Sequence, residues 1–480
     1  MDRELMLLEQ EIEKIHAKAK EFGLDFFPMR FEVCPPEILY TFGAYGMPTR
    51  FSHWSFGKSF HRMKTQYDYN LSRIYELVIN SDPCYAFLLE GNSLLQNKLV
   101  VAHVFAHSDF FKHNACFQGS NRQMVDTMAN NAQRIREFEF LYGRKAVEAF
   151  LDAAMAVEEH VESHRETKSG SRKYSAQSKN SPQHSGRSNK FPPQANAGYD
   201  SPYDDLWALD VYVTGKQNQA EPAIPKKGQK FPPEPEKDLM LFIANHARGL
   251  EPWQREILYM LREEMIYFLP QMETKIMNEG WAALWHARIM RELDLDGDET
   301  IEFAKMHSGV LQPGRMQLNP YLLGMKIFES IEAKWSQDSP EAGLAKIFEV
   351  RELESDISFL RNYLTKELVE ELDLYVYKKV GDKWVIVEKD WEVIRDNLVG
   401  RLVNHGMPYI VVEDGDYKGN GELYLKHCFE GIELDLKYLE KTLAHVHTLW
   451  GRDVHLETVL EERPILFTSN GKDTQRKKLA

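Results

Sequence analysis

The apolar stretch Leu99-Val-Val-Ala-His-Val-Phe-Ala-His107 carries two histidines four residues apart, His103 and His107. This spacing predicts a helix with both imidazoles on the same face, within reach of one metal ion. Asp109 and His113 follow within six residues and are suited to fix the tautomer of a ligating imidazole. The alternative is that one or both histidines are core residues bonded to nearby carbonyl groups, because this spacing also arises by chance.

A second apolar helical region is predicted at residues 253–290, and it carries polar side chains at helical spacing. Glu279 supplies a carboxylate there, and His286 lies two turns further along the same face. With His103 and His107, Glu279 would complete a two-histidine, one-carboxylate site for a divalent metal ion, which we expect to be zinc. His286 would be either a fourth ligand or a proton donor. A water-exposed polar stripe is the alternative interpretation.

This layout resembles that of the zincin metallopeptidases, in which a distant segment, here Asn278-Glu-Gly-Trp-Ala282, joins the His-x-x-x-His helix. Zincins carry a glutamate after the first histidine that deprotonates the metal-bound water, whereas this chain has Val104. A hydrolase would therefore need another base. We expect Glu264 or Glu263, because burial can raise the pKa of a helix carboxylate. Tyr267 would then stabilise an oxyanion.

We predict an α+β protein, with a mainly helical, zincin-like body and a small C-terminal α+β domain. One Ser-, Gln-, Lys- and Pro-rich segment has too few aliphatic side chains to offset the entropy of ordering, which predicts a flexible insertion. The predicted parts are a helical domain with the histidine pair (1–164), the low-complexity insertion (165–237), a second helical domain (238–371), the α+β domain (372–470) and a solvated basic tail (471–480).

Local patterns predict the elements within these parts. Prolines and aromatic residues at 23–57 indicate an ordered loop, and helices are expected at 58–69 and 71–79. A longer helix is predicted at 121–164. Pro270 is expected to kink or divide the helical region that contains it.

The pattern changes near residue 372. Residues 372–387 alternate around a Gly-Asp turn and predict a β-hairpin. The elements expected after it are a helix near 391–404, strands at 408–416 and 422–427, and a helix at 436–450.

Charge and composition exclude several classes of protein. The net charge of −14 argues against a protein that coats nucleic acid. No stretch approaches the ~18 apolar residues of a membrane span, and the charged start is not a secretory signal. Four scattered cysteines without a Cys-x-x-Cys pair indicate a reducing compartment. We therefore expect a cytoplasmic protein without a nucleic-acid partner.

Three further motifs are interpreted as structural. His160 and His164 repeat the four-residue spacing but lie at the edge of the insertion, where a solvated helix end is expected. Residues 294–302 mimic a calcium loop, but the glycine is misplaced and Lys305 stands where the bidentate glutamate belongs. Residues 414–421 are glycine-rich without the Gly-Lys-Ser/Thr ending of a P-loop, which favours a turn.

Eight short blocks occur in one order across almost the whole chain. They are His53-Trp-Ser-Phe-Gly57, Tyr75-Glu-Leu-Val-Ile-Asn80, Ala102-His-Val-Phe-Ala-His-Ser-Asp-Phe-Phe111, Trp253-Gln-Arg-Glu-Ile-Leu258, Tyr267-Phe-Leu-Pro-Gln271, Asn278-Glu-Gly-Trp-Ala282, Asn319-Pro-Tyr-Leu-Leu-Gly324 and Gly415-Asp-Tyr417. Together they resemble the stage V sporulation protein R family, the SpoVR-like proteins.

The resemblance implies a cytoplasmic bacterial protein required for normal spore cortex (peptidoglycan) formation. It also implies a link, in relatives from non-sporulating bacteria, to stress responses and a PrkA-like serine kinase. It supplies no settled activity. The residues therefore leave two hypotheses open: a metal-dependent hydrolase of the gluzincin type acting on a peptide or peptidoglycan precursor, and a non-enzymatic regulator or assembly factor with a structural metal site or none.

Overall fold

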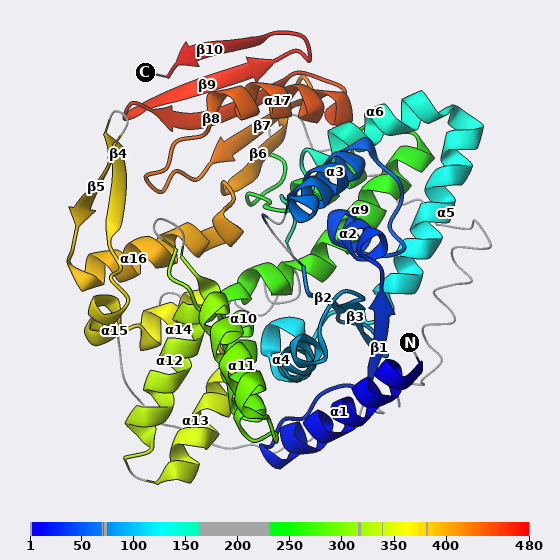
Figure 1. Cartoon of the computed structure of the whole chain (residues 1–480). Coiled ribbons are helices and arrows are strands. Elements are labelled where there is room, and N and C mark those ends of the chain that lie inside the picture. Colours follow the sequence, from blue (N-terminus) through cyan, green and yellow to red (C-terminus); the bar gives the residue numbers. More distant parts are fainter. Residues whose placement is uncertain are drawn as a thin grey trace, which may run out of the picture.

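The computed structural model describes residues 2–69, 71, 74–162, 230–314, 318–337, 339–380 and 383–479. Most of the predicted insertion at 165–237 lies outside these residues. The described chain is mainly helical and contains three small sheets (Figure 1). The predicted α+β class is confirmed.

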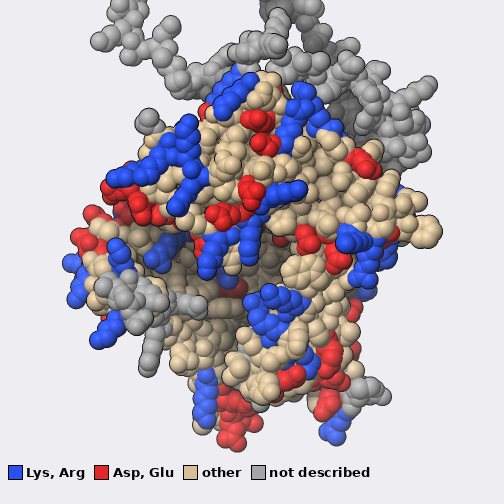
Figure 2. Space-filling model, turned by 90° about the horizontal axis from the view of Figure 1, so that it is seen from above, with Lys and Arg blue, Asp and Glu red and all other residues tan. Residues whose placement is uncertain are grey.

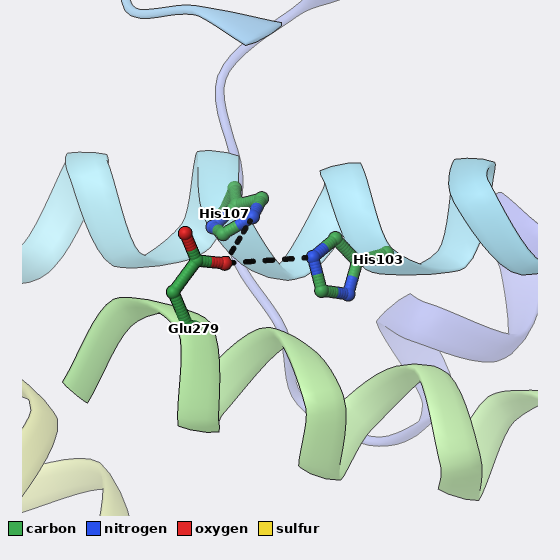
Figure 3. Close-up of side chains that lie close together, drawn as sticks. All are labelled: His103, His107 and Glu279. Carbon is green, nitrogen blue, oxygen red and sulfur yellow. Dashed lines mark ion pairs between the residues drawn. The ribbon is translucent and has the colours of Figure 1, made fainter. Parts of the chain in front are cut away.

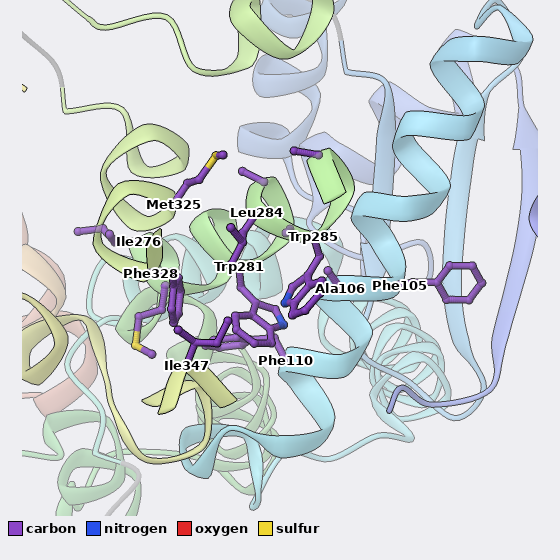
Figure 4. Close-up of a cluster of buried hydrophobic side chains, with 14 of the residues drawn as sticks. Phe105, Ala106, Phe110, Ile276, Trp281, Leu284, Trp285, Met325, Phe328 and Ile347 are labelled. Carbon is purple, nitrogen blue, oxygen red and sulfur yellow. The ribbon is translucent and has the colours of Figure 1, made fainter. Parts of the chain in front are cut away.

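The helical body is built around two long helices that lie side by side, α4 (Leu94–His113) and α10 (Lys275–Arg291). Both are buried around most of their circumference, unlike a surface helix with one apolar stripe. Trp281 on α10 is fully buried, with ring centroids 5.4 Å from Trp285 and 5.2 Å from Phe328 (Figure 4). The helices that surround this core are α1 (Asp2–Glu21), α11 (Gly297–Val310), α12 (Pro320–Trp335), α13 (Pro340–Leu353), α14 (Asp356–Tyr363), α15 (Lys366–Glu371) and α16 (Trp391–Leu402).

Two glycines let α10 and α12 approach backbone to backbone. A Cβ atom at Gly280 would collide with the backbone of Gly324, and one at Gly324 would collide with the carbonyl oxygen of Ile276. No other residue type fits where two helix backbones touch. The contact joins two of the sequence blocks that carry the family resemblance, because each block contains one of these glycines.

A three-stranded sheet packs beside α4, with the order β1 (Met29–Cys34), β3 (Cys84–Leu89), β2 (Glu76–Ile79). β1 is parallel to β3, and β2 is antiparallel to it. The sheet corrects two predictions, the loop at 23–57 and the helix at 71–79. A four-residue segment such as Glu76–Ile79 is too short to show a period that separates strand from helix, so a partner distant in sequence decides its conformation.

Two helices also lie within or across the predicted loop, α2 (Pro36–Tyr45) and α3 (Trp54–Asp68). Pro36 occupies the first turn of α2, where a missing N–H costs nothing. The proline therefore starts a helix here instead of preventing one. The helix predicted at 58–69 is the C-terminal part of α3.

The long helix predicted at 121–164 is two helices, α5 (Met124–Tyr142) and α6 (Arg144–Met155). They are divided at Gly143, whose φ of 88° is incompatible with a continuous helix.

Two further helices, α8 (Leu239–His246) and α9 (Pro252–Glu273), pack against each other, and α9 also contacts α5 and α6. Pro270 lies inside α9, and the division from α10 falls at Thr274, whose hydroxyl donates to the Pro270 carbonyl at 2.7 Å.

The hairpin predicted near residue 372 is present as β4 (Val376–Val380) and β5 (Lys383–Glu388). The helix that follows it, α16, packs on α14 and places Ile394 and Val399 in the core of the helical body. The change to a sheet domain therefore comes after α16.

The C-terminal domain is a five-stranded sheet covered by α17 (Leu436–Trp450). Its order is β10 (Thr474–Lys478), β9 (Arg463–Ser469), β8 (Val454–Leu460), β7 (Glu422–His427), β6 (Ile410–Tyr417), with β7 parallel to β8 and the other pairs antiparallel. The predicted solvated tail at 471–480 contains β10 instead. Its side chains are mostly exposed and basic, which suits an edge strand. The same composition is typical of a solvated tail, so the sequence alone did not predict a strand. Figure 2 shows lysine, arginine and acidic side chains interspersed over one face of the molecule.

We expect Gly280→Ala to lower the free energy of unfolding by about 3 kcal/mol, because α10 and α12 must separate to admit the methyl group. Gly400→Ala is the matched control. It adds the same methyl group to α16 where nothing lies within 4 Å, so it should stabilise by about 0.5–1 kcal/mol. Urea unfolding measures both variants, and equal effects would contradict the close contact.

Candidate metal centre

The histidine pair is held by a helix with a well-defined start. Ser93 accepts a hydrogen bond from the Gln96 backbone at 3.2 Å, and the Gln96 side chain accepts from the Ser93 backbone at 2.8 Å. This capping box begins α4 at Leu94. As predicted, His103 and His107 share one helix face, and both are buried, at 4% and 6% exposure.

Glu279 on α10 faces both imidazoles (Figure 3). Its Oε2 lies 3.9 Å from His103 Nε2 and 3.6 Å from His107 Nε2. The ligand atoms of these three residues lie within 4.8 Å of one another. The same Oε2 is buried and has no hydrogen-bond partner among the described residues. The structure thus brings together three of the four predicted ligands.

The Nδ1 atom of His107 has a hydrogen-bond partner, Asn278. His107 Nδ1 lies 2.9 Å from Asn278 Oδ1, an acceptor, so this nitrogen carries the proton in the neutral ring. The lone pair of Nε2 then points toward Glu279 Oε2, another acceptor. Two acceptors in this position repel unless a cation lies between them, so the donor set fits a metal ion.

His286 does not join the three candidate ligands. Its Nδ1 lies 3.0 Å from His103 Nδ1, and its Nε2 lies 2.9 Å from His307 Nδ1 on α11. Both ring nitrogens thus lie within hydrogen-bond distance of other histidines, and the role of His286 as a fourth ligand or a proton donor stays a prediction. Burial lowers the pKa of His286 to about 3, and that of His103 well below its usual value, so both rings are neutral.

The calcium-like sequence at 294–302 caps a helix. Asp296 caps α11 by accepting from the Glu299 backbone at 2.8 Å, and the Glu299 side chain accepts from the Asp296 backbone at 3.2 Å. The acidic residues therefore start the helix that carries His307.

A cavity of about 640 Å³ opens beside His103. His286, Glu76 and Tyr321 line it together with apolar side chains. Burial, reinforced by the charge of Glu279, raises the pKa of Glu76 to about 7. Burial also raises the pKa of Tyr321, and the neighbouring charge of Glu279, to which its hydroxyl is hydrogen-bonded, adds to this effect.

Sequence reasoning missed Glu76, Tyr321 and His307. Glu76 lies on a strand expected to be a helix, and Tyr321 reaches the site only because α12 packs closely on α10. A signal was present for the first two, because each lies within a block that carries the family resemblance. His307 had no such signal.

The predicted base Glu264 has a structural partner. Its buried Oε2 accepts from Arg50 Nε at 2.8 Å, and its Oε1 accepts from Asn131 at 3.5 Å. Burial raises its pKa, as predicted, and Arg50 opposes the shift. Glu264 does not belong to the group of close ligand atoms, and its role as the base stays a prediction.

Glu263 and Tyr267 are also engaged elsewhere. Glu263 is exposed and accepts from Asn121 at 3.2 Å. The buried Tyr267 hydroxyl donates to the Asn80 carbonyl at 3.2 Å. Residue spacing on α9 correctly placed these side chains on one helix face. It could not show that Asn121 and Asn80, from other parts of the chain, are their hydrogen-bond partners.

Of the two remaining motifs, the structure describes one histidine of the first and the whole of the second. His160 follows the end of α6 and is half-buried, and His164 lies outside the described residues. The glycine-rich segment 414–421 comprises the end of β6 and the turn to β7, in which Gly419 and Gly421 both have a φ of 71°.

Family models match nearly the whole chain. SpoVR like protein matches residues 2–407, and the SpoVR-like C-terminal domain matches residues 408–461. The chain belongs to the SpoVR family. This membership implies a sporulation-related protein, and the family boundary falls between α16 and β6.

A relative within this family is Uncharacterized protein YcgB from Escherichia coli (strain K12). It is 30% identical over an alignment 497 residues long, and this alignment covers 96% of this chain and 93% of YcgB. No solved structure matches the chain. None of the described helices is long and apolar enough to cross a membrane.

The metal-free protein should lose stability below pH 6.5. The unfolded state binds a proton on His286 from about this pH, whereas the folded state resists it down to about pH 3. We expect this group to cost about 1 kcal/mol of stability between pH 7 and pH 5.5. His286→Gln removes this contribution, so its free energy of unfolding should fall less over the same interval.

Urea unfolding at the two pH values measures the effect. His61→Gln changes an exposed histidine on α3 and should keep the pH dependence of the unmodified protein. Identical pH slopes for His286→Gln and the unmodified protein would show that His286 is not buried in its neutral form.

Proposed function

We propose that the chain is a metal-dependent hydrolase in which His103, His107 and Glu279 bind one divalent ion, zinc. The observation that carries this proposal is the buried, unpartnered Glu279 Oε2 facing two imidazole nitrogens. Two histidines with one carboxylate are a common catalytic zinc set, which leaves a coordination position open. The adjacent cavity is large enough for part of a peptide or a peptidoglycan precursor.

The spacing of the ligand atoms supports this assignment. Zinc ligands at about 2.0–2.1 Å in a tetrahedron lie roughly 3.3 Å from one another. The separations of 3.6 and 3.9 Å from Glu279 Oε2 to the two histidines are slightly larger. Small side-chain rotations would therefore complete the site without a change in the helices.

Glu76 is the best-placed base. When bound, the metal ion would act as a Lewis acid on the scissile carbonyl and on a water molecule. A carboxyl group with a pKa near 7 accepts a proton from water efficiently at neutral pH. Val104, which stands where zincins have glutamate, is fully buried in the core and takes no part.

Tyr321 would stabilise the negative charge that develops on the substrate oxygen. Its raised pKa keeps the hydroxyl protonated at neutral pH, and once Glu279 bound the ion, this single proton could turn from that carboxylate to the substrate oxygen. Within the sporulation-related role of the family, the proposed substrate is a peptide-bearing precursor of the spore cortex.

The position of Val104 also favours a second candidate function, a non-enzymatic regulator with a structural metal site. Val104 leaves no carboxylate directly after His103, where zincins carry their base, so the protein would bind zinc without turnover. The two functions agree on metal binding and differ in the role of Glu76.

We expect the purified protein to bind one zinc ion per chain. His103→Ala/His107→Ala should weaken zinc binding by at least about a hundredfold, because the loss of two ligands leaves one carboxylate. His427→Ala, which removes another buried histidine from β7, should bind zinc normally. Equilibrium dialysis with metal analysis measures all three proteins, and equal zinc contents would contradict the site.

We expect Glu76→Gln to lower kcat for hydrolysis of peptidoglycan-precursor peptides by about 10²–10⁴-fold while leaving zinc binding intact. Mass spectrometry of the released fragments measures the rate. Glu263→Gln is the matched control, because it neutralises an exposed carboxylate and should retain full activity. Zinc binding without hydrolysis by the unmodified protein would favour the regulator.

A further inference from the structure

The β4–β5 hairpin is an exposed apolar ribbon. Four consecutive side chains of β5 are exposed: Trp384 at 54%, Val385 at 45%, Ile386 at 40% and Val387 at 51%. Successive side chains of a strand point to opposite faces, so both faces of the ribbon are uncovered at this strand. Figure 1 shows the hairpin at the margin of the molecule.

The outer edge of β5 is also open. Within the described part of the chain, β5 pairs with β4 and with no other strand. A two-stranded hairpin is marginally stable in water by itself, and an exposed apolar edge strand is a template for pairing. The register shift between Val376 and Tyr377 lies at the end of the hairpin far from its turn, so Lys383–Ile386 stays in regular register.

The sequence of β5 is complementary to itself. It reads Lys383-Trp-Val-Ile-Val-Glu388, with a basic residue at one end, an acidic residue at the other and apolar residues between them. Antiparallel pairing of two copies about a two-fold axis at Val385 places Trp384 opposite Ile386 of the other copy. It also brings Lys383 beside the end of the strand that carries Glu388. Parallel pairing would place like charges together.

The carboxylate of Glu388 is held in place by backbone hydrogen bonds. Its Oε1 accepts from the backbone N–H groups of Lys389 at 2.8 Å and Asp390 at 2.9 Å, which fixes the carboxylate at the strand end. These hydrogen bonds favour the charged form and lower the pKa of Glu388. A lysine from a second copy would therefore meet a fixed negative charge.

We propose that two copies of this chain associate through β5, forming one four-stranded antiparallel sheet across a two-fold axis. Closed two-fold pairing uses the same surface on both copies and removes the open edge. The contact buries apolar side chains at its centre and places two ion pairs at its rim, as in other protein interfaces.

Sedimentation equilibrium of the full chain over a range of concentrations tests this proposal. We expect a monomer–dimer equilibrium that Ile386→Lys weakens by about a hundredfold or more, because two lysines would meet near the axis. Val393→Lys is the matched control. It adds the same charge at an exposed apolar position of α16 (48% exposed) and should leave the dimer unchanged.

Charge reversal tests the pairing direction. Lys383→Glu should weaken the dimer about tenfold, and Lys383→Glu/Glu388→Lys should restore it, because the ion pairs re-form with exchanged partners. Oxidation should also link Val385→Cys across the axis as a covalent dimer, whereas Val393→Cys should remain monomeric. A monomer at every concentration, or a dimer insensitive to Ile386→Lys, would overturn the proposal, and binding of an unrelated peptide along β5 by a monomeric chain would assign the edge to another partner.

Discussion

The buried carboxylate of Asp109 fixes α4 against α10, and the geometry of the candidate site depends on it. Asp109 is fully buried, pairs with Arg351 at 3.2 Å and accepts from Trp281 Nε1 at 2.9 Å and the Asp25 backbone at 2.8 Å. Burial raises its pKa, and the positive charge of Arg351 opposes that shift. Asp109 follows His107 by two residues, and Trp281 follows Glu279 by two. The hydrogen bond between them therefore sets the register that places the carboxylate of Glu279 opposite the imidazoles.

A second constraint acts on the other side of α10. The backbone contact between Gly280 and Gly324 lets α12 approach closely enough for Tyr321 to reach Glu279. Gly280 is the neighbour of Glu279, and Gly324 is less than one turn from Tyr321. Three blocks that are far apart in the sequence thus form one unit, in which the ligands, the packing residues and the cavity wall position one another. This explains why the motifs contain glycine and tryptophan as well as residues suited to chemistry.

The sequence predicted the parts of the site that depend on local geometry. The spacing of His103 and His107 determines their common face on any helix, and the apolar residues around Glu279 indicated that it lies on a largely buried helix. Glu76 and His307 could not be found in this way, because strand pairing and the packing of α11 bring them to the site. Glu264 shows the converse. Its burial was predicted correctly, but its carboxylate forms an ion pair with Arg50, which is more than 200 residues away in the chain. Likewise, the basic tail became β10 because β9 offers it an edge.

The electrostatics of the site connect its fold with its proposed chemistry. Neutral histidines, an unpartnered carboxylate oxygen and a second carboxyl group with a pKa of about 7 lie together in a largely apolar region. Without a cation this arrangement opposes folding, because the buried Oε2 of Glu279 has no hydrogen-bond partner and faces the Nε2 lone pair of His107. A divalent ion would reverse both effects at once, since it would pair with the carboxylate and accept the lone pairs of the imidazoles. The aromatic core around Trp281 packs directly beside this site, and the proposed cation would offset the unfavourable placement of Glu279.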